Sequence, residues 1–344
     1  MKAITYLSAG GAGHHFDYDR LFAAVAKDID ALLTLPSSCA ANNEADPRFY
    51  AMFDTRPRET SKALLRAILR SLRGQRTIGL FFRPGSCFID GSPKSALRRL
   101  LFRLVAHLPN IYILSIVPFD LSPKFSSVAT NWIYDPQLWD LSYLEVPTLH
   151  GTAALGALLL EVAKHRRIIV ALGGQNRSKG FDYMVDLWEA SGELREEYLF
   201  VASGEVAPQS RDAADRFQRA GGLLIDRRIQ NEELFYLYRK AHAVWNCYAP
   251  DYNQSSGIHG RAVQLGVPAI VRAGSYLESL GEMLPHPTLA LPFSRTSEAI
   301  TLLLDWNPVP PDGALTEALV RRMRDHSISV LAHAIGTSPR MHST

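Results

Sequence analysis

Short apolar runs alternate with helix-patterned segments along almost the whole chain, and this alternation restricts the fold more than any other feature. In the first half, apolar runs at residues 3–7, 31–35, 77–82 and 111–117 are separated by helical patterns near 19–31, 61–72 and 94–107. Such alternation is typical of α/β domains in which helices cover a mostly parallel sheet. The first half therefore predicts one doubly wound α/β unit.

The same alternation restarts after residue 167. Between 140 and 167, Pro147, Gly151 and Gly156 interrupt the pattern, and strands are then expected at 168–172, 198–202, 222–225, 243–247 and 268–271. A length of 344 residues also suits two domains that each bury a core. We therefore predict Rossmann-like domains at 1–150 and 151–312, followed by a segment at 313–344 with a helix near 316–334.

Composition excludes several classes of protein. Hydrophobic residues make up 47% of the chain and charged residues 21%, which excludes collagen-like, coiled-coil and largely disordered chains. The longest apolar stretches are far shorter than the roughly 20 residues that span a bilayer. Cys39, Cys87 and Cys247 are far apart and lack CxxC spacing, so neither a disulfide framework nor a cysteine zinc site is indicated. We expect a cytoplasmic protein without membrane-spanning segments.

A glycine-bearing loop with two basic residues follows the strand expected at 168–172. It contains Gly173, Gly174, Arg177 and Lys179 and leads into a helix. Backbone N–H groups and the positive end of the helix dipole favour an anion at such a helix start, and neighbouring cations add charge-assisted hydrogen bonds. The loop therefore suits a diphosphate. A solvated turn with incidental basic residues is the alternative, and this loop by itself does not decide between them.

Three further motifs follow in a fixed order. Gly204 lies in a small-residue turn after the strand expected at 198–202, and the run 226–234 leads into a helix. Ser255, Ser256 and Gly257 then open a helix that a glycine ends before a proline-started strand. The amides of these three residues form a second helix start that can face an anion.

In their order and spacing, the four motifs resemble the nucleotide-sugar-binding domain of GT-B glycosyltransferases and are most similar to the group 1 glycosyltransferases. The resemblance covers about residues 168–276. It implies an α/β fold of two Rossmann-like domains that face each other across a cleft, the donor bound by the C-terminal domain and the acceptor by the N-terminal one. It also implies that the last helix crosses back to brace the first domain.

The resemblance assigns roles to individual residues. Lys179 corresponds to a basic residue that holds the donor diphosphate, whereas Arg177 is a stand-in for a family arginine that would fall at Gly174. The loop before the helix near 231–241 lies along the nucleotide base in the family. The donor-binding residues implied are Gly173, Gly174, Arg177, Lys179, Gly204, Arg228, Ile229, Asn253, Ser255, Ser256, Gly257 and Arg261.

One pair of residues departs from the family pattern. The family usually has two glutamates with seven residues between them, and Asn253 and Arg261 stand at those positions. The second glutamate normally binds ribose, so ribose recognition stays unassigned. Arg261 either contacts phosphate or points to solvent, and His259 nearby is a weaker candidate for a ligand contact.

The first half has its own candidates after the strand at 3–7. A glycine-rich loop leads to a histidine pair and Asp17, and a histidine beside a carboxylate can deprotonate an acceptor hydroxyl. A helix-capping cluster is the alternative. We predict His14 and Asp17, with Lys179, as catalytic residues, and Gly11, Gly13, His15 and Arg83 on the acceptor side.

Residues 56–107 are strongly basic. They carry twelve basic and two acidic side chains, a formal charge of +10, although the whole chain has only +3. The helix expected at 61–72 has an apolar side, which we expect to pack on the sheet, and a basic side. Its apolar side comprises Leu64, Leu65, Ile68, Leu69 and Leu72, and its basic side Lys62, Arg66, Arg70 and Arg73. The basic side suits anionic lipid headgroups, with a solvated face as the alternative; no nucleic-acid motif accompanies it.

These features predict a glycosyltransferase of the hexosyltransferase class. The expected reaction moves a sugar from a nucleotide-diphosphate donor to a hydroxyl of a polyprenyl-diphosphate-linked bacterial glycan, such as an exopolysaccharide or capsule, at the inner face of the cytoplasmic membrane. We expect no metal or other cofactor, because fixed cations and helix starts can stabilise the leaving diphosphate. A sugar-nucleotide 2-epimerase of the same fold and a non-catalytic partner subunit are the alternatives.

Overall fold

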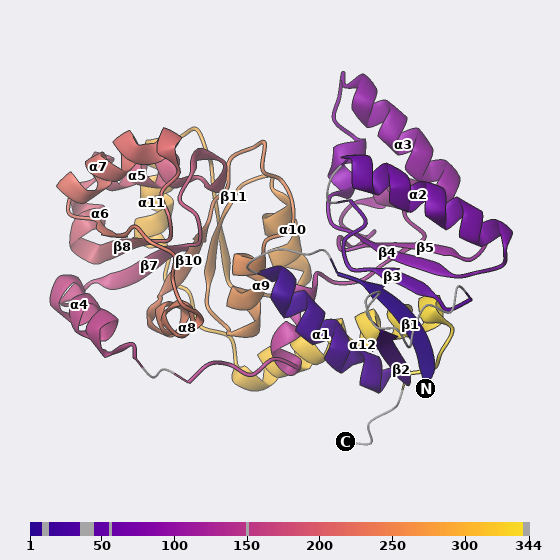
Figure 1. Cartoon of the computed structure of the whole chain (residues 1–344). Helices are drawn as coiled ribbons and strands as arrows, with labels where there is room; N and C mark the ends of the chain where they lie inside the picture. The colour runs from indigo at the N-terminus through magenta and orange to yellow at the C-terminus, as the bar shows by residue number, and fades with distance from the viewer. Residues whose placement is uncertain (9–13, 35–44, 55–56, 149–150, 340–344) are drawn as a thin grey trace. The chain divides into compact units, whose positions relative to one another are not determined.

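The computed structural model describes residues 1–8, 14–34, 45–54, 57–148 and 151–339, without the side chains of 14–16, 57 and 58. The chain divides into two compact units: Met1–Leu144 with Val320–Thr344, and Glu145–Leu319. Each unit contains one six-stranded sheet whose strand pairs are all parallel (Figure 1). The predicted α/β class with two Rossmann-like domains is confirmed.

The sheet of the first unit has the strand order β2-β1-β3-β4-β5-β6. Its strands are β1 (Lys2–Leu7), β2 (Ala31–Thr34), β3 (Arg48–Tyr50), β4 (Thr77–Phe81), β5 (Ile111–Ser115) and β6 (Asn131–Trp132). The helices are α1 (His14–Asp28), α2 (Pro57–Leu72), α3 (Pro93–Ala106) and most of α12 (Gly313–Ile335). The strand order reverses between β1 and β3, because β2 lies on one side of β1 and the later strands on the other.

Helices α2 and α3 cover the same face of this sheet (Figure 1). They connect three successive neighbouring strands, and right-handed crossovers place both connections on one face. Leu64 of α2 and Phe102 of α3 accordingly belong to the same buried cluster, together with Phe81 and Ile113 from the sheet.

The helix α2 corrects the prediction made for its apolar side. Its buried apolar residues are Ala63, Leu64 and Ala67, whereas Leu65, Leu69 and Leu72 are exposed. The alanines and Leu64 lie on the side of the helix that faces the sheet, so the three exposed leucines lie on another side. The expectation that all the leucines pack on the sheet is therefore wrong.

Three residues of the predicted basic region are also engaged in structural contacts. Arg70 is buried and donates to the carbonyls of Asp46 and Arg76. Arg98 pairs with the buried Asp54 at 3.6 Å, and Arg76 donates to the carbonyls of His333 and Ala334 in α12. The basic region therefore presents fewer charges to solvent than its sequence implies.

The sheet of the second unit has the order β12-β11-β10-β7-β8-β9. Its strands are β7 (Arg167–Leu172), β8 (Tyr198–Ser203), β9 (Leu223–Ile225), β10 (Ala243–Asn246), β11 (Ala269–Arg272) and β12 (Thr288–Leu291). The helices are α4 (Ala153–Ala163), α5 (Phe181–Ala190), α6 (Gly192–Glu197), α7 (Arg211–Arg219), α8 (Asn231–Lys240), α9 (Gly257–Gln264), α10 (Tyr276–Met283) and α11 (Thr296–Asp305).

Two separate cores lie on the two faces of this sheet. Apolar residues of α5, α6, α7 and α11 form one cluster, and those of α4, α8 and α9 form the other. Both faces are therefore covered, which explains why β8 is buried at every residue and reads as an unbroken apolar run. The central strand β7 pairs Ile169 with Phe200 of β8 and with Ala243 of β10.

Short 3-10 helices complete the two units. They are η1 (Pro84–Cys87), η2 (Pro123–Ser127), η3 (Pro136–Leu138), η4 (Asp140–Ser142), η5 (Arg177–Lys179) and η6 (Pro208–Ser210). Among the described residues, no helix is both long enough and apolar enough to cross a bilayer.

Candidate functional site

The strand order of the second unit reverses at β7, which locates the expected binding position. The chain runs from β7 outward to β8 and β9, and then returns to place β10 on the other side of β7. Ligands of such sheets bind outside the carboxyl ends of the strands at this reversal. The loops at that position are residues 173–180 after β7 and 247–256 after β10.

Gln175 braces the loop after β7 from within. Its side chain is buried, and its amide nitrogen Nε2 donates to the carbonyls of Ala171 at 3.0 Å and Gly173 at 2.8 Å. Its backbone N–H donates to the carbonyl of Glu205 at 2.9 Å, which ties the loop to the turn after β8. The backbone of the predicted anion-binding loop is thus fixed by the protein itself.

Gly204 is required where these two loops touch. A Cβ atom at this position would lie 2.0 Å from the carbonyl oxygen of Gly173, and its φ of +137° is one that other residues rarely adopt. Gly173 itself has a φ of +82°. These two predicted glycines are therefore explained by loop geometry.

Gly180 joins the loop after β7 to the loop after β10. It has a φ of +72°, and a Cβ there would lie 2.0 Å from the carbonyl oxygen of Cys247. The N–H of Ala249 donates to the carbonyl of Ser178 at 3.1 Å. Asn176 caps η5 by accepting from the N–H of Lys179 at 3.0 Å. The helix that the sequence predicts after this loop is α5, which begins at Phe181.

The ammonium group of Lys179 lies against two tyrosine rings. Its Nζ is 4.3 Å from the ring centroid of Tyr248 and 4.4 Å from that of Tyr252. Burial acts to lower the pKa of Lys179, but the two tyrosines outweigh burial, so the pKa lies above its ordinary value. Lys179 is therefore a fixed positive charge at neutral pH.

Tyr248 connects this charge to the start of α9. Its hydroxyl accepts from Nδ2 of Asn246 at 2.9 Å and shares a hydrogen bond with Oγ of Ser256 at 2.7 Å. Ser256 caps α9, because its Oγ accepts from the N–H of His259. Tyr248 therefore links Lys179 to Ser256 and Gly257, which lie much later in the sequence.

Arg177 has a different environment from Lys179. Its guanidinium pairs with Asp182 at 3.1 Å, and 79% of its side chain is exposed. Asp182 is also held by the hydroxyl of Ser210 at 3.0 Å. Arg177 and the exposed Gly174 thus lie in the same loop as Lys179, but the guanidinium is engaged at the start of α5.

Asn253 and Arg261, which replace the family's glutamates, both have structural contacts. The side-chain oxygen of Asn253 accepts from the N–H of Tyr276, the first residue of α10, at 2.8 Å. Arg261 is buried in α9, with its guanidinium 5.6 Å from the ring centroid of Phe235. It does not point to solvent, which excludes one of the two readings left open by the sequence. Ser255 is half-buried before α9.

His259 and His286 form a buried pair, with ring centroids 6.0 Å apart. Burial and the neighbouring His286 lower the pKa of His259 to about 3. Burial lowers the pKa of His286 to about 4, although a hydrogen bond to the backbone of Val267 opposes the shift. Both rings are neutral at pH 7, and His259 belongs to the core.

Arg228 and Ile229 follow β9, two strands from β7. Arg228 is exposed and Ile229 is half-buried. Asp226 fixes this loop by accepting from the N–H of Val206 at 2.8 Å, and Arg227 makes two hydrogen bonds to Glu233. The exposed Arg228 therefore lies at the same edge of the sheet as Lys179, with β8 between their strands.

The predicted acceptor residues are in the first unit. Gly11 and Gly13 lie outside the described residues, as do the side chains of His14 and His15, whose backbone forms the start of α1. Asp17 is half-buried in the first turn of α1.

Two further contacts occur at the strand ends of the first unit. Tyr6 at 2.8 Å and Ser8 at 2.7 Å both donate to Asp19, at the carboxyl end of β1. Arg83 is exposed after β4, and its N–H donates to Asp54 at 2.8 Å.

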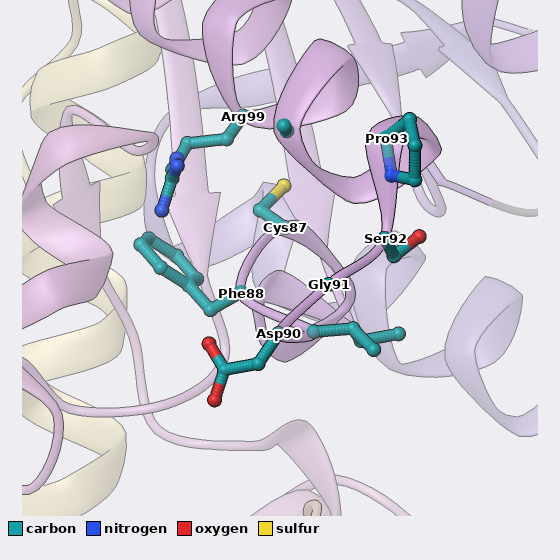
Figure 2. Close-up of a pocket in the computed structure, with 9 residues that line it drawn as sticks. Cys87, Phe88, Asp90, Gly91, Ser92, Pro93 and Arg99 are labelled. Atoms are coloured by element: carbon teal, nitrogen blue, oxygen red, sulfur yellow. The ribbon is translucent and has the colours of Figure 1, made fainter.

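A cavity of about 330 Å³ lies at the start of α3, and none of the predicted residues lines it. Figure 2 shows the guanidinium of Arg99 beside the ring of Phe88, which lies 5.6 Å away, and the Cys87 side chain between the loop and α3. Within the described part of the chain, no group of three or more histidine, cysteine, aspartate or glutamate residues is placed to hold a metal ion.

No motif in the sequence points to Tyr248, Tyr252 or Gln175 as residues of the candidate site. Their roles depend on contacts between loops that are distant in the sequence. The only available signal is the cluster of two aromatic residues in the short loop between β10 and α9.

No family model matches the chain, and no curated protein matches it in sequence. Its structure is similar to that of WaaG, a glycosyltransferase involved in lipopolysaccharide biosynthesis, at a TM-score of 0.54 and 12% identity over 97% of this chain and 98% of that one. The structure of Anabaena Alr3699/HepE in complex with UDP and glucose has a TM-score of 0.56 and 13% sequence identity, and the match covers 98% of each chain. MnaA of S. aureus with UDP has a TM-score of 0.54 and 12% sequence identity over the whole of both chains. The chain therefore has the GT-B fold, built from two Rossmann-like α/β domains.

Proposed function

We propose that the chain is a glycosyltransferase whose second unit binds a nucleotide-diphosphate sugar. The observation that carries this proposal is the connection of Lys179 through Tyr248 to Ser256 at the start of α9. This arrangement places a fixed cation and a helix start together at the reversal of strand order, where such sheets bind ligands. The UDP bound in HepE and MnaA, which have the same fold, supports a nucleotide ligand.

The site can assist departure of the nucleoside diphosphate. Negative charge builds on the phosphate oxygens as the bond to the sugar breaks, so a fixed cation stabilises the transition state more than the ground state. Lys179 would supply this charge, and the backbone N–H groups at the start of α9 would supply hydrogen bonds. With these groups in place, we propose that transfer does not need a metal ion.

Other predicted donor contacts are assigned by position. Arg228 and Ile229, after β9, would lie along the base, and Arg177 would contact the diphosphate after releasing Asp182. Arg261 lies in α9, four residues after Gly257, and its charge adds to the positive potential around that helix start. Ribose recognition has no carboxylate at the family position, since Asn253 and Arg261 stand there.

We propose a lipid-linked glycan as the acceptor. The first unit carries the exposed basic residues of α2 and α3, which suit a molecule presented at an anionic membrane surface. The hydroxyl would be deprotonated by His14 with Asp17. The proposed location is the inner face of the cytoplasmic membrane.

Two assays test this function. Nucleoside diphosphates based on uracil, guanine and adenine, and their sugars, should be screened for a rise in melting temperature, because a ligand that binds the native state stabilises it. The protein is then given the nucleotide sugar that binds, together with a polyprenyl-diphosphate-linked saccharide as the acceptor. Transfer to the saccharide supports the proposal. Epimerised nucleotide sugar formed without an acceptor would favour the epimerase, and the lack of any stabilising nucleotide would refute both.

A further inference from the structure

The outer surface of α2 and α3 combines exposed leucines with basic residues. We name this the α2–α3 surface and define it by Leu65, Leu69 and Leu72 of α2, Leu97, Leu100, Leu101 and Leu104 of α3, and the exposed Lys62, Arg66, Arg73, Lys94, Arg99 and Arg103. The exposed fraction is 58% for Leu65, 79% for Leu72, 58% for Leu97 and 60% for Leu104.

The leucines form a stripe on each helix. On α2 they are spaced four and three residues apart, and on α3 three, one and three residues apart, so each set projects from one side of its helix. Both helices also bury a different set of residues, including Leu64 and Phe102, against the sheet. The exposed leucines are therefore a second apolar side that the core of the first unit does not use.

Charge on this surface is of one sign. Six exposed basic residues belong to it, whereas the nearby exposed carboxylates are Glu59, which pairs with Lys62 at 3.1 Å, and Asp90 before α3. Lys124 lies near the ring of Phe88, as Arg99 does, and so adds one further positive charge beside the cavity at the start of α3. An apolar stripe bordered by lysine and arginine is the pattern of helices that lie in the interface of an anionic bilayer.

A single exposed leucine is ordinary in a soluble protein. Seven exposed leucines on two adjacent helices, however, leave apolar surface in contact with water, which is unfavourable. We propose that the α2–α3 surface docks on an anionic lipid bilayer, with the leucines inserted between the headgroups and the basic residues paired with lipid phosphates. The choice of lipid over a soluble partner rests on the proposed function. The proposed function involves only contact between basic residues and the membrane. Docking through this surface adds an apolar contribution from the exposed leucines.

Vesicle co-sedimentation of the full chain tests the inference. The probes are vesicles of phosphatidylcholine alone and of phosphatidylcholine with about one third phosphatidylglycerol. The leucine variant is L69S/L97S/L101S/L104S, the basic variant is R66S/R73S/R103S, and the control is L160S/L315S. Leu160 and Leu315 are 75% and 69% exposed and lie in the second unit, so the control removes exposed leucines outside the α2–α3 surface.

We expect wild-type protein and the control to sediment with anionic vesicles and the leucine variant to bind at least tenfold more weakly. The basic variant should bind anionic vesicles more weakly than the wild type at low salt. This difference should shrink as salt is added, because salt screens the contribution of the basic residues but not that of the leucines. Equal binding by wild type and leucine variant would overturn the inference, as would failure of wild type to bind anionic vesicles. A wild-type dimer that becomes a monomer in the leucine variant would assign the surface to a second copy instead.

The readout is independent of the donor site. All variants should keep the melting temperature of the wild type and its rise with nucleotide, since the substituted residues are exposed and none of them belongs to the proposed donor site. If no nucleotide stabilises any of them while vesicle binding follows the expected order, the proposed function fails and the docking surface remains.

Discussion

Nζ of Lys179 lies 4.3 Å from the ring centroid of Tyr248, and the hydroxyl of the same tyrosine is 2.7 Å from Oγ of Ser256. One aromatic side chain therefore aligns the cation of the first loop with the start of α9. A cation over an aromatic ring is attracted by the negative face of the ring, so Lys179 is held in place before any anion arrives.

Replacing Lys179 with alanine should reduce turnover by about an order of magnitude or more, because the charge that meets the leaving diphosphate is lost. The matched control is K240A, which removes an exposed lysine that also lies near a tyrosine ring, 5.7 Å from the centroid of Tyr236. Steady-state kinetics with the identified donor provide the measurement. Unchanged turnover in K179A, with the melting temperature preserved, would remove Lys179 from the mechanism.

The Y248F substitution should weaken both the fold and the site. It keeps the ring over Lys179 but removes the hydroxyl that Asn246 and Ser256 contact, and buried polar groups left unpaired cost about 1–3 kcal/mol. Urea unfolding should show a loss of this order, and the affinity for nucleotide should fall as α9 loses its fixed start. The control is Y236F in α8. A Y248F protein with wild-type stability would contradict the role given to the hydroxyl.

G180A should be destabilising, because a Cβ at Gly180 would meet the carbonyl of Cys247 at 2.0 Å. The positive φ alone costs on the order of 1–3 kcal/mol for a residue other than glycine, and the overlap adds to this. G174A is the control, since a Cβ at Gly174 has no neighbour closer than 3.8 Å. Melting temperatures of the two variants should separate clearly, and equal values would show that the contact between the two loops is not tight.

Acid should destabilise the second unit through His259 and His286. Their folded pKa values are about 3 and 4, below the ordinary 6.5, so the unfolded chain takes up protons that the folded chain excludes. Stability is therefore fully present above pH 6.5 and falls as the pH decreases toward 4, by about 1.4 kcal/mol per pH unit for each histidine. Urea unfolding between pH 4.5 and 7, compared for wild type, H259Q and the exposed-site control H165Q, measures the slope. An unchanged slope in H259Q would refute the assignment.

Chelation should leave sugar transfer intact. In the proposed mechanism, Lys179 and the start of α9 would supply the positive potential that a divalent ion provides elsewhere. Transfer rates measured before and after dialysis against EDTA should agree. A rate that falls on chelation and returns with added magnesium would show that the diphosphate needs a metal.

Elements with strong patterns were predictable from the sequence. The strands β7, β8 and β10 were expected within a residue or two of their observed bounds, because their apolar runs are unambiguous. The strands β3 and β12 were missed. Arg48–Tyr50 is only three residues long, and Thr288–Leu291 is an edge strand, so neither gives a distinct period.

The burial of α2 was predicted wrongly for a physical reason. Helical periodicity identifies Leu65, Leu69 and Leu72 as one stripe, but it does not say that the smaller stripe with Ala63 and Ala67 faces the sheet. That choice depends on how closely the helix approaches β4 and β5. Contacts between separate loops, such as Lys179 with Tyr248, are likewise set by strand order, which local sequence does not encode.

The buried amide of Gln175, bonded to the carbonyls of Ala171 and Gly173, has a consequence for binding energetics. A loop that is already ordered loses little conformational entropy when an anion arrives, so more of the contact energy remains as affinity. Amide hydrogens in this loop should then exchange at nearly the same slow rate with and without nucleotide.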